Sequence, residues 1–416
     1  MGSFTFLHSP VQRKYAAMRG AQRAGKVFPA RMYSLVFSDT DQKEGIRMSQ
    51  RLTINMNSKP IYDIVYEQDF KSLAGELEQF GIGEKKLCIV TDSRVKGFYA
   101  DEVRGALADH CKEIFVFDFP DGEQSKNLDT VRNIYEFLIQ NRFGRKDMLI
   151  ALGGGVVGDT TGFVAATYLR GIDFIQIPTS LLAQVDSSIG GKTGVDFDQY
   201  KNMVGAFYMP KLVYMNVATL RTLDDRQYYS GMGEVLKHGL IKSAAFYEWT
   251  LEHMYEIHDR NLDTLEDMVY KSCTCKKIVV EKDPTEKGER AILNFGHTIG
   301  HAIEKAKHFE LMHGECVALG CVAAAYISWK RDLLSKDEYY EIRDMFVPFN
   351  LPISIEDINP EEIYELTGSD KKVEGDKLKF ILLKKVGKAM IDTTVTKDEM
   401  IAGINEIYFT DEDWDE

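Results

Sequence analysis

A glycine-rich loop at the end of a strand most constrains the fold of this chain. Residues 148–152 form a short apolar run that leads into Gly153-Gly154-Gly155-Val156-Val157-Gly158-Asp159. The pattern Gly-x-Gly-x-x-Gly is met where a strand ends and a helix begins. Backbone without side chains can approach a pyrophosphate there, and the helix offers free N–H groups. By itself, the loop indicates nucleotide binding no more strongly than a tight turn.

Apolar runs alternate with amphipathic stretches on both sides of this loop. Short buried strands are predicted at residues 61–66, 87–91, 114–117, 148–152 and 174–177. Helical patterns separate most of them, for example at 128–140, where apolar residues recur every three to four positions. Strand–helix alternation predicts a parallel sheet that is covered by helices on both faces.

The character of the sequence changes near residue 215. Amphipathic helices are predicted at 228–241, 244–256 and 262–281, and β-branched runs are scarce until 380–383. The longest uncharged stretch, residues 316–329, has 14 residues. A membrane helix needs roughly 18, so this stretch is predicted to be a buried helix. We therefore expect an α/β domain at 48–215, a helical domain at 216–416 and no membrane span.

The first 47 residues form a basic extension. The first 38 contain no acidic residue but include Arg13, Lys14, Arg19, Arg23, Lys26 and Arg31. Organelle targeting peptides have this composition, although we favour a start at Met48 or a disordered arm, and hence a cytoplasmic protein. At the opposite end, residues 411–416 form an acidic tail that is predicted to be solvated.

The charge balance excludes one class of partner. The chain has 64 acidic and 51 basic residues, a net charge of −13, whereas nucleic-acid binders normally present a basic face. A small anionic ligand needs only a few local cations and is not excluded. The six cysteines are scattered along a long apolar-rich chain, which is typical of free thiols.

Four of the nine histidines fall between residues 297 and 313. His297 and His301 stand four residues apart, so a helix places both rings on one face. His313 and Glu234 lie in two further predicted helices. Two histidines and one carboxylate form a common catalytic zinc site. Spacing favours His297 and His301 as the ligand pair, with His313 third; helix-capping or buried polar roles are the alternative.

Cations and acids suited to an anionic ligand occur in several segments. A small-residue loop ends in Lys192, and such a loop can cradle a phosphate, although its glycine spacing does not fit a Walker loop. An acid that could bind a ribose is not found after the strand at 174–177. Asp92, which closes the strand at 87–91, is the better candidate.

Five blocks resemble the 3-dehydroquinate synthase family: GGGVVGDTTGFVAATYLRG, DSSIGGKT, GMGEVLKHGLI, ERAILNFGHTIGHAIE and MHGE. They lie in the family's order between about residues 60 and 405. The resemblance implies a Rossmann-like NAD-binding N-terminal domain, an all-α metal-binding C-terminal domain and an active site in the cleft between them. It also implies a homodimer that converts 3-deoxy-D-arabino-heptulosonate 7-phosphate to 3-dehydroquinate and phosphate in the shikimate pathway, with NAD and zinc or cobalt.

Carried over by position, the resemblance implies Glu234, His297 and His313 as metal ligands, so that His301 faces substrate instead. The implied phosphate contacts are Lys192, Asn202, Asn294, His301 and Lys372, with Arg170 of a partner subunit. The substrate carboxylate would face Lys276 and Arg290, and its hydroxyl groups Asp186, Lys237 and Glu286.

The implied NAD contacts are Asp92, Asp121, Gly122, Glu123, Lys126, Gly155, Val156, Val157, Gly158, Asp159, Thr179, Ser180, Lys192, Lys201, Thr219, Leu220, Arg221 and Thr222. The chain departs from the family pattern at Ser180, Tyr200, Asp224 and Gly233, where Thr, Gly, Pro and Ala are usual, and none of these changes removes a charged contact.

Two other activities are compatible with these residues. A sister sugar-phosphate cyclase would act on sedoheptulose 7-phosphate or glucose 6-phosphate, substrates that lack the carboxylate. A metal-dependent polyol dehydrogenase would release NADH and would not need the cations. The match at Lys276, Asn294, His301 and Lys372 favours the dehydroquinate pattern over the sister cyclases.

Overall fold

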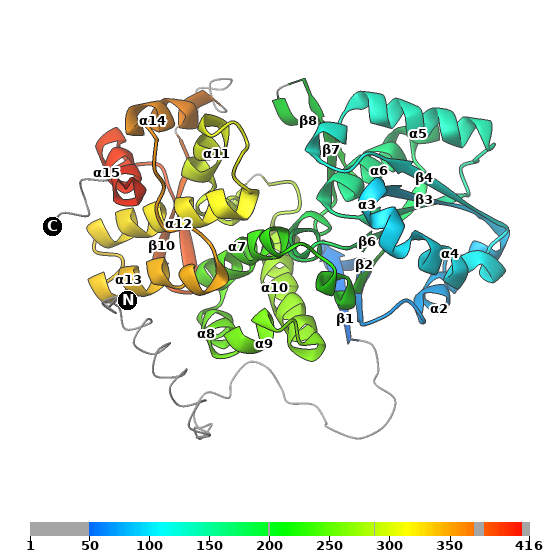
Figure 1. Ribbon diagram of the computed structural model, residues 1–416, viewed down its shortest axis with the longest axis horizontal. Helices are drawn as coiled ribbons and strands as arrows, with labels where there is room; N and C mark the ends of the chain where they lie inside the picture. The colour runs from blue at the N-terminus through cyan, green and yellow to red at the C-terminus, as the bar shows by residue number, and fades with distance from the viewer. Residues whose placement is uncertain (1–49, 199, 287, 370–377, 410–416) are drawn as a thin grey trace, which may run out of the picture.

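The computed structural model describes residues 50–198, 200–286, 288–369 and 378–409, so the basic extension, the acidic tail and Lys372 lie outside the described residues. An α/β half and a helical half lie side by side (Figure 1). The α/β half is built on a seven-stranded sheet of order β1-β2-β9-β6-β5-β3-β4, in which β1 is antiparallel and the other strands are parallel. The strands are β1 (Gln50–Met56), β2 (Lys59–Glu67), β3 (Lys86–Asp92), β4 (Glu113–Phe119), β5 (Met148–Gly153), β6 (Asp173–Pro178) and β9 (Leu212–Asn216).

Helices cover both faces of this sheet, as the alternation predicted. On one face lie α2 (Leu73–Glu78) and α4 (Asp101–Leu107), and on the other α5 (Leu128–Gln140) and α6 (Gly155–Thr167). Leu87 and Ile89 of β3 belong to one core and Cys88 and Val90 to the other, because successive side chains of a strand point to opposite faces. A central strand with helices on both faces must therefore be apolar throughout.

The strand order reverses between β3 and β5. The chain runs outward from β3 to β4 and then crosses back to β5, on the other side of β3. Ligands of open α/β sheets bind beyond the carboxyl ends of the strands at such a reversal. Asp92 ends β3 and Gly153 ends β5, so the predicted nucleotide loop lies at this point.

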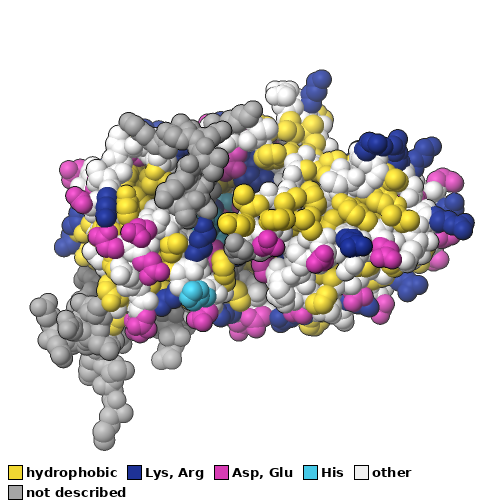
Figure 2. Space-filling view, turned by 90° about the horizontal axis from the view of Figure 1, so that it is seen from above, with side chains coloured by type: hydrophobic (Ala, Val, Ile, Leu, Met, Phe, Trp, Pro, Cys, Tyr) yellow, Lys and Arg dark blue, Asp and Glu magenta, His cyan; other side chains and the backbone are white. Residues whose placement is uncertain are grey.

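A hairpin of β7 (Lys192–Phe197) and β8 (Tyr200–Phe207) projects from the α/β half and was not predicted (Figure 1). Its exposed apolar side chains are Phe197, Tyr200, Met203 and Phe207. When the molecule is viewed from above, hydrophobic side chains gather over this part of the α/β half (Figure 2).

The second half is helical, as predicted, and α12 runs through its core. Its helices are α7 (Asp225–Lys242), α8 (Ala244–Glu252), α9 (Met254–His258), α10 (Leu262–Lys282), α11 (His297–Ala306), α12 (His313–Lys330), α13 (Lys336–Asp344), α14 (Pro360–Ser369) and α15 (Lys397–Ile407). Helix α12 contains the predicted buried segment. No helix among the described residues is long and apolar enough to cross a membrane.

Two predictions for this half need correction. The helix expected over residues 244–256 is two helices that meet at His253, where the backbone leaves helical geometry. The half is also not all-α, because β10 (Phe380–Lys385) and β11 (Lys388–Asp392) form an antiparallel hairpin.

Asp224, where the family usually has Pro, caps α7 by accepting hydrogen bonds from the backbone N–H groups of Arg226 and Gln227.

One apolar core joins the two halves. Ile64, Val213 and Met215 of the sheet share a buried cluster with Leu236 of α7 and Val269 of α10. The helical half is therefore held against β2 and β9. The domain boundary near residue 215 stays a prediction; β9 ends at Asn216 and α7 begins at Asp225.

Helices α11 and α12 approach each other at glycine. A Cβ atom on Gly320 would lie 1.8 Å from the carbonyl oxygen of Gly296, and one on Gly300 would lie 2.7 Å from that of Cys316. Gly296 itself has a φ of 79° and immediately precedes α11. This backbone contact sets where the first residue of α11, His297, lies.

Gly320→Ala is expected to lower the free energy of unfolding by about 3 kcal/mol, because the added methyl group cannot fit without moving α11. Gly75→Ala, in α2, is the matched control, since nothing lies within 4 Å of its Cβ; it should stabilise by about 0.5 kcal/mol. Urea denaturation followed by circular dichroism measures both. A Gly320→Ala protein as stable as the wild type would contradict the close contact.

Candidate active site

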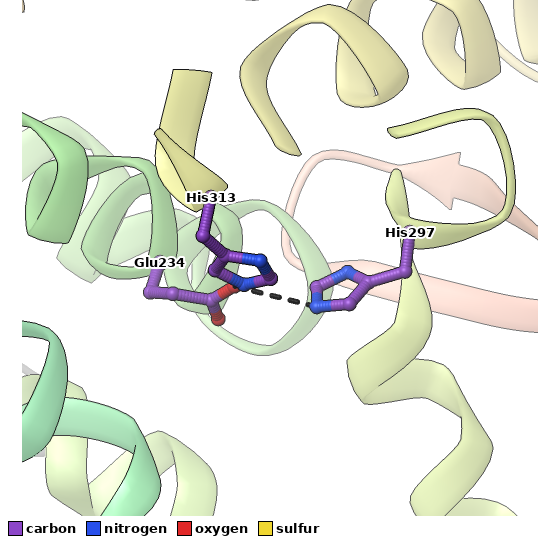
Figure 3. Close-up of side chains that lie close together, drawn as sticks. All are labelled: Glu234, His297 and His313. Atoms are coloured by element: carbon purple, nitrogen blue, oxygen red, sulfur yellow. Dashed lines mark ion pairs between the residues drawn. The ribbon is translucent and has the colours of Figure 1, made fainter. Parts of the chain in front are cut away.

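Three side chains from three helices meet in the helical half (Figure 3). Glu234 lies within α7, and His297 and His313 are the first residues of α11 and α12. The Oε1 atom of Glu234 is 3.5 Å from Nε2 of His297 and 3.4 Å from Nε2 of His313. One ligand atom from each residue lies within 4.8 Å of the others, so the group could hold a metal ion.

Close backbone contacts place these ligands. A Cβ on Gly314 would lie 1.8 Å from the carbonyl oxygen of Ser230, and one on Gly233 would lie 2.8 Å from that of Gly314. The start of α12 therefore packs directly on α7, and Gly314 donates its N–H to the Ser230 hydroxyl at 3.0 Å. Alanine, usual in the family at position 233, would require this contact to open.

The chemistry of the three groups suits a divalent cation. Glu234 is fully buried, and its carboxylate oxygens face the ammonium group of Lys237 and the rings of His297 and His313. Burial opposes its ionisation, but Lys237, His313 and His297 outweigh it and hold the Glu234 pKa well below its usual range. The ring of His297 can donate Nδ1–H to the Phe295 carbonyl at 3.2 Å, which leaves Nε2 to bind a metal.

Two further buried residues of α7 surround the Glu234 carboxylate. Lys237 forms an ion pair with its Oε2 atom. Nε2 of His238 lies 3.9 Å from the same oxygen, while Nδ1 hydrogen-bonds the Ser272 hydroxyl at 2.8 Å. Burial lowers the pKa of His238 to about 3, so its ring is neutral. Sequence analysis missed His238, although it stands one helical turn after Glu234.

A second group that could hold a metal shares His313. It consists of His301, Glu304 and His313, again with ligand atoms within 4.8 Å of one another. The rings of His297 and His301 have centroids 5.0 Å apart, so His301 lies beside the first group. Sequence analysis missed Glu304, yet positions 297, 301 and 304 share one helical face and could have indicated it.

The cations predicted to face a carboxylate lie where the two halves meet. Nζ of Lys276, on α10, donates to both Oδ1 and the carbonyl oxygen of Asp186 at 2.6 Å. Arg290 is 2% exposed and donates to the Pro284 carbonyl at 2.7 Å. Burial lowers the pKa of both cations against the opposing acids. Nε of Arg290 is buried and has no hydrogen-bond partner among the described residues, so the guanidinium group can still bind an incoming anion.

Another group combines three of the predicted residues. Lys192 forms an ion pair with Glu286, and the Asn294 amide donates to Glu286 at 3.4 Å. The Lys192 side chain is 52% exposed, so it can reach an incoming anion. Asn202 lies instead beside Lys126, whose ammonium group donates to its side-chain oxygen at 2.6 Å.

The predicted nucleotide residues gather around the start of α6. Lys126 is buried and pairs with Asp159 at 2.8 Å. Thr179 donates its backbone N–H to the Gly153 carbonyl at 3.0 Å, which joins the loop to the end of β6. A Cβ on Gly153 would lie 2.5 Å from Val157, so this loop conformation requires glycine.

Most of the remaining nucleotide predictions fall into three segments near the carboxyl edge of the sheet, whereas Lys201 lies on β8 and pairs with Glu304 of α11. Asp92 caps α3 (Ser93–Val95), and Ser93 bonds Asp121 at 3.2 Å, next to Gly122 and Glu123. Ser180 follows β6. The third segment is η7 (Val217–Arg221) and its cap, with Thr219, Leu220, Arg221 and Thr222. Tyr99 lies a few residues after α3 and contacts the third segment through a hydrogen bond with Thr222.

Two predicted residues are not brought to this site. Lys372 lies outside the described residues. Arg170 follows α6, whose 13 residues rise about 20 Å from the glycine loop, so it lies at the opposite edge of the sheet. Leu169, Arg170 and Gly171 all have positive φ angles, and Leu169 is exposed.

The fold is that of the sugar-phosphate cyclases. A 2-deoxy-scyllo-inosose synthase complexed with carbaglucose-6-phosphate, NAD+ and Co2+ superposes with a TM-score of 0.76 and 26% identity, covering 86% of this chain and 100% of that one. A 2-epi-5-epi-valiolone synthase from Streptomyces hygroscopicus subsp. jinggangensis 5008, with NAD+ and Zn2+ bound, has a TM-score of 0.77 and 24% identity, covering 86% and 99%.

Sequence relationships identify the family. The model of the 3-dehydroquinate synthase N-terminal region matches residues 116–230, and that of the 3-dehydroquinate synthase C-terminal region matches 231–373. A 3-dehydroquinate synthase of Acetivibrio thermocellus is 43% identical over 351 residues, 84% of this chain and 97% of the relative. The chain belongs to the 3-dehydroquinate synthase family.

Removal of single histidines distinguishes the group of Glu234, His297 and His313 from the group that contains His301 and Glu304. His297→Ala should lose bound Co2+, because the Glu234 group then keeps only two ligands, whereas His301→Ala should retain it. Metal content after dialysis, measured by mass spectrometry, gives the result. His110→Ala, a half-exposed histidine of the α/β half, is the control. Retention by His297→Ala with loss by His301→Ala would place the metal in the group with Glu304.

Proposed function

We propose that this protein is a 3-dehydroquinate synthase that converts 3-deoxy-D-arabino-heptulosonate 7-phosphate to 3-dehydroquinate and phosphate. One observation carries the proposal: the buried Glu234 group and the buried cations Lys276 and Arg290 all lie around Asp186. Carboxylate oxygens of Asp186 and Glu234 lie within 4.8 Å of each other, and Nζ of Lys276 is 2.6 Å from Oδ1 of Asp186. Burial lowers the pKa of Arg290, and the nearby carboxylates of Glu286 and Asp186 oppose this effect. A substrate with hydroxyl groups beside a carboxylate needs this combination, whereas a neutral polyol does not.

The residues fit NAD and one zinc or cobalt ion. Glu234, His297 and His313 would hold the metal, and the loop from Gly153 to Asp159 would hold the pyrophosphate of NAD. The related 2-deoxy-scyllo-inosose synthase holds NAD+ and Co2+, which supports this assignment. When bound, the metal lowers the pKa of a substrate hydroxyl group, and NAD takes a hydride from the substrate and later returns it.

The chain's own residues hold the substrate during these steps. Lys276 and Arg290 would bind its carboxylate, with Asp186 and Lys237 at its hydroxyl groups. Both cations are already desolvated, so the interaction with an anion is strong and specifies its position. Fixed charges of this kind stabilise the reacting group without reorganising during the reaction.

Lys192, Asn294 and His301 would hold the phosphate, and Asn202 would contribute from the α/β half. Oxidation of a substrate hydroxyl group to a ketone makes the C–H bond on the neighbouring carbon acidic. Its proton moves to a phosphate oxygen, the C–O bond breaks, and the electron pair leaves with phosphate. Because phosphate itself accepts the proton, the protein needs no separate strong base at that carbon. Ring opening and aldol closure follow the return of the hydride.

A homodimer completes the proposal, with Arg170 of the partner subunit at the phosphate. Arg170 lies at the opposite edge of the sheet from the glycine loop of its own chain. A partner could also cover the exposed apolar side chains of the β7–β8 hairpin, since exposed apolar patches commonly mark interaction surfaces (Figure 2).

Phosphate release from 3-deoxy-D-arabino-heptulosonate 7-phosphate should occur with Co2+ or Zn2+ and NAD, and should stop with a chelator. Absorbance at the NADH wavelength should not rise, because each turnover returns its hydride. Sedoheptulose 7-phosphate, which lacks the carboxylate that Lys276 and Arg290 would bind, is the matched control. Steady NADH formation without phosphate would indicate a dehydrogenase, and phosphate from sedoheptulose 7-phosphate alone would indicate a sister cyclase.

Mixing two inactive variants tests the partner's arginine. Arg170→Ala and His313→Ala should each have little activity, but a mixed dimer has one site with an intact His313 and an intact arginine from its partner. After co-refolding at equal amounts, roughly a quarter of wild-type activity should return, since half the dimers are mixed and one site in each works. No recovery, with dimers present by ultracentrifugation, would show that Arg170 acts only within its own chain or elsewhere.

A further inference from the structure

We propose that Glu304 is a positioning residue that orients His313 toward the metal, and that Lys201 of the β7–β8 hairpin holds Glu304 in place. This inference rests on the proposed metal site of Glu234, His297 and His313. It adds a link from the ligand shell to the half of the molecule that would carry NAD.

The contacts form one continuous chain. Nζ of Lys201 is 2.8 Å from Oε1 of Glu304, and Oε2 of Glu304 is 4.0 Å from Nδ1 of His313. Nε2 of the same ring is 3.4 Å from Glu234. Each ring nitrogen of His313 therefore faces a different carboxylate. A shift of about 1 Å would turn the 4.0 Å contact into a hydrogen bond.

The direction in which each ring nitrogen of His313 points decides which of the two carboxylates, Glu234 or Glu304, is a metal ligand. Nε2 of His313 and Nε2 of His297 both face Oε1 of Glu234. A metal held there uses Nε2 of His313, and the proton of the neutral ring then lies on Nδ1, which faces Glu304. Carboxylates in this position fix the ring and raise its basicity as a ligand. The contact thus makes Glu304 a support of His313 and not a ligand.

Burial explains why Glu304 must have both partners. The residue is 8% exposed, and a buried carboxylate is costly unless its oxygens are paired. One oxygen faces Lys201 and the other faces His313. Glu304 is therefore held by one contact from the hairpin and one from the start of α12.

Lys201 brings the α/β half into this arrangement. Its ammonium group comes from β8 and lies 4.2 Å from the ring centroid of Phe309, which follows α11. The ion pair with Glu304 thus spans the junction between the hairpin and α11. Any movement of the hairpin relative to α11 changes how firmly Glu304 is held, and through it the orientation of His313.

Titration with Co2+, followed by its visible absorption, tests the role of Glu304 without requiring turnover. Glu304→Ala should bind Co2+ about 10 to 100 times more weakly than wild type and with an altered spectrum, because the His313 ring is no longer held. Glu304→Gln should lose less, since its amide oxygen can still accept Nδ1–H. Glu310→Gln, an exposed acid after α11, is the matched control and should bind as wild type.

The outcomes separate this inference from the metal site itself. Wild-type affinity and spectrum in Glu304→Ala, with loss of binding in His297→Ala, would overturn the inference and leave the metal site standing. Equal binding by wild type and His297→Ala would overturn the metal site. Thermal unfolding by circular dichroism confirms that each variant is folded.

Lys201→Met tests the link across the junction. Its Co2+ affinity should fall several-fold and its spectrum should shift in the same direction as that of Glu304→Ala. Lys211→Met, a half-exposed lysine just before β9 that pairs with Asp173, is the control. A Lys201→Met protein with wild-type affinity and spectrum would show that Glu304 acts without the hairpin.

Discussion

The fully buried carboxylate of Glu234 is the feature on which the rest of this structure depends. A carboxylate in a protein core costs several kcal/mol unless it is compensated, roughly as much as a small domain's whole stability. Here Lys237 supplies one positive charge, and two imidazole rings complete the surroundings. Bringing these groups to Glu234 requires α12 to begin against α7 and α11 to begin against α12, which the backbone contacts at Gly233, Gly314 and Gly320 permit. These glycines of the helical half therefore position the site residues as well as allowing the helices to pack closely.

The α/β half contributes to the site through the strand order of its sheet, not through a buried charge. Reversal of strand order between β3 and β5 leaves two strand ends, at Asp92 and Gly153, beside each other at the carboxyl edge of the sheet. The loop after β6 then carries Asp186 toward Lys276 of the helical half, and the ion pair between them joins the two surfaces. A substrate bound between Asp186 and Glu234 lies within reach of both. One chain can thus hold a nucleotide on a rigid sheet edge and a metal on helix ends, each on the scaffold that suits it.

Sequence patterns predicted most of this scaffold because the constraints are local. The strand at 87–91 is apolar on both faces, and the helix at 128–140 was predicted with the bounds it has. The β7–β8 hairpin was missed because Tyr200, Lys201, Asn202 and Met203 are all exposed and show no alternation. Spacing alone favoured His297 with His301, since it reports only neighbours on one helix. The resemblance put Glu234 and His313 in the ligand set in place of His301, which local spacing could not do because Glu234 and His297 are 63 positions apart. His238 and Glu304 each stand about one helical turn after a predicted site residue, Glu234 and His301, so the shared helical faces could have indicated both.

The division of the site between two halves has a mechanical consequence. In the proposed reaction, hydride transfer would require a substrate oriented by groups of the helical half to meet a nicotinamide held by the α/β half. A misplacement of about 1 Å at such a centre can cost a hundredfold in rate. The shared core holds the halves together and extends to Val185 and Val235, next to Asp186 and Glu234, so the site is anchored on its apolar side. Polar contacts at the junction, Lys276 with Asp186 and Lys201 with Glu304, act where the spacing matters. Both contacts involve charges that also act on the substrate or on the metal ligands. A change in the relative position of the two halves therefore also changes the electrostatics of the site.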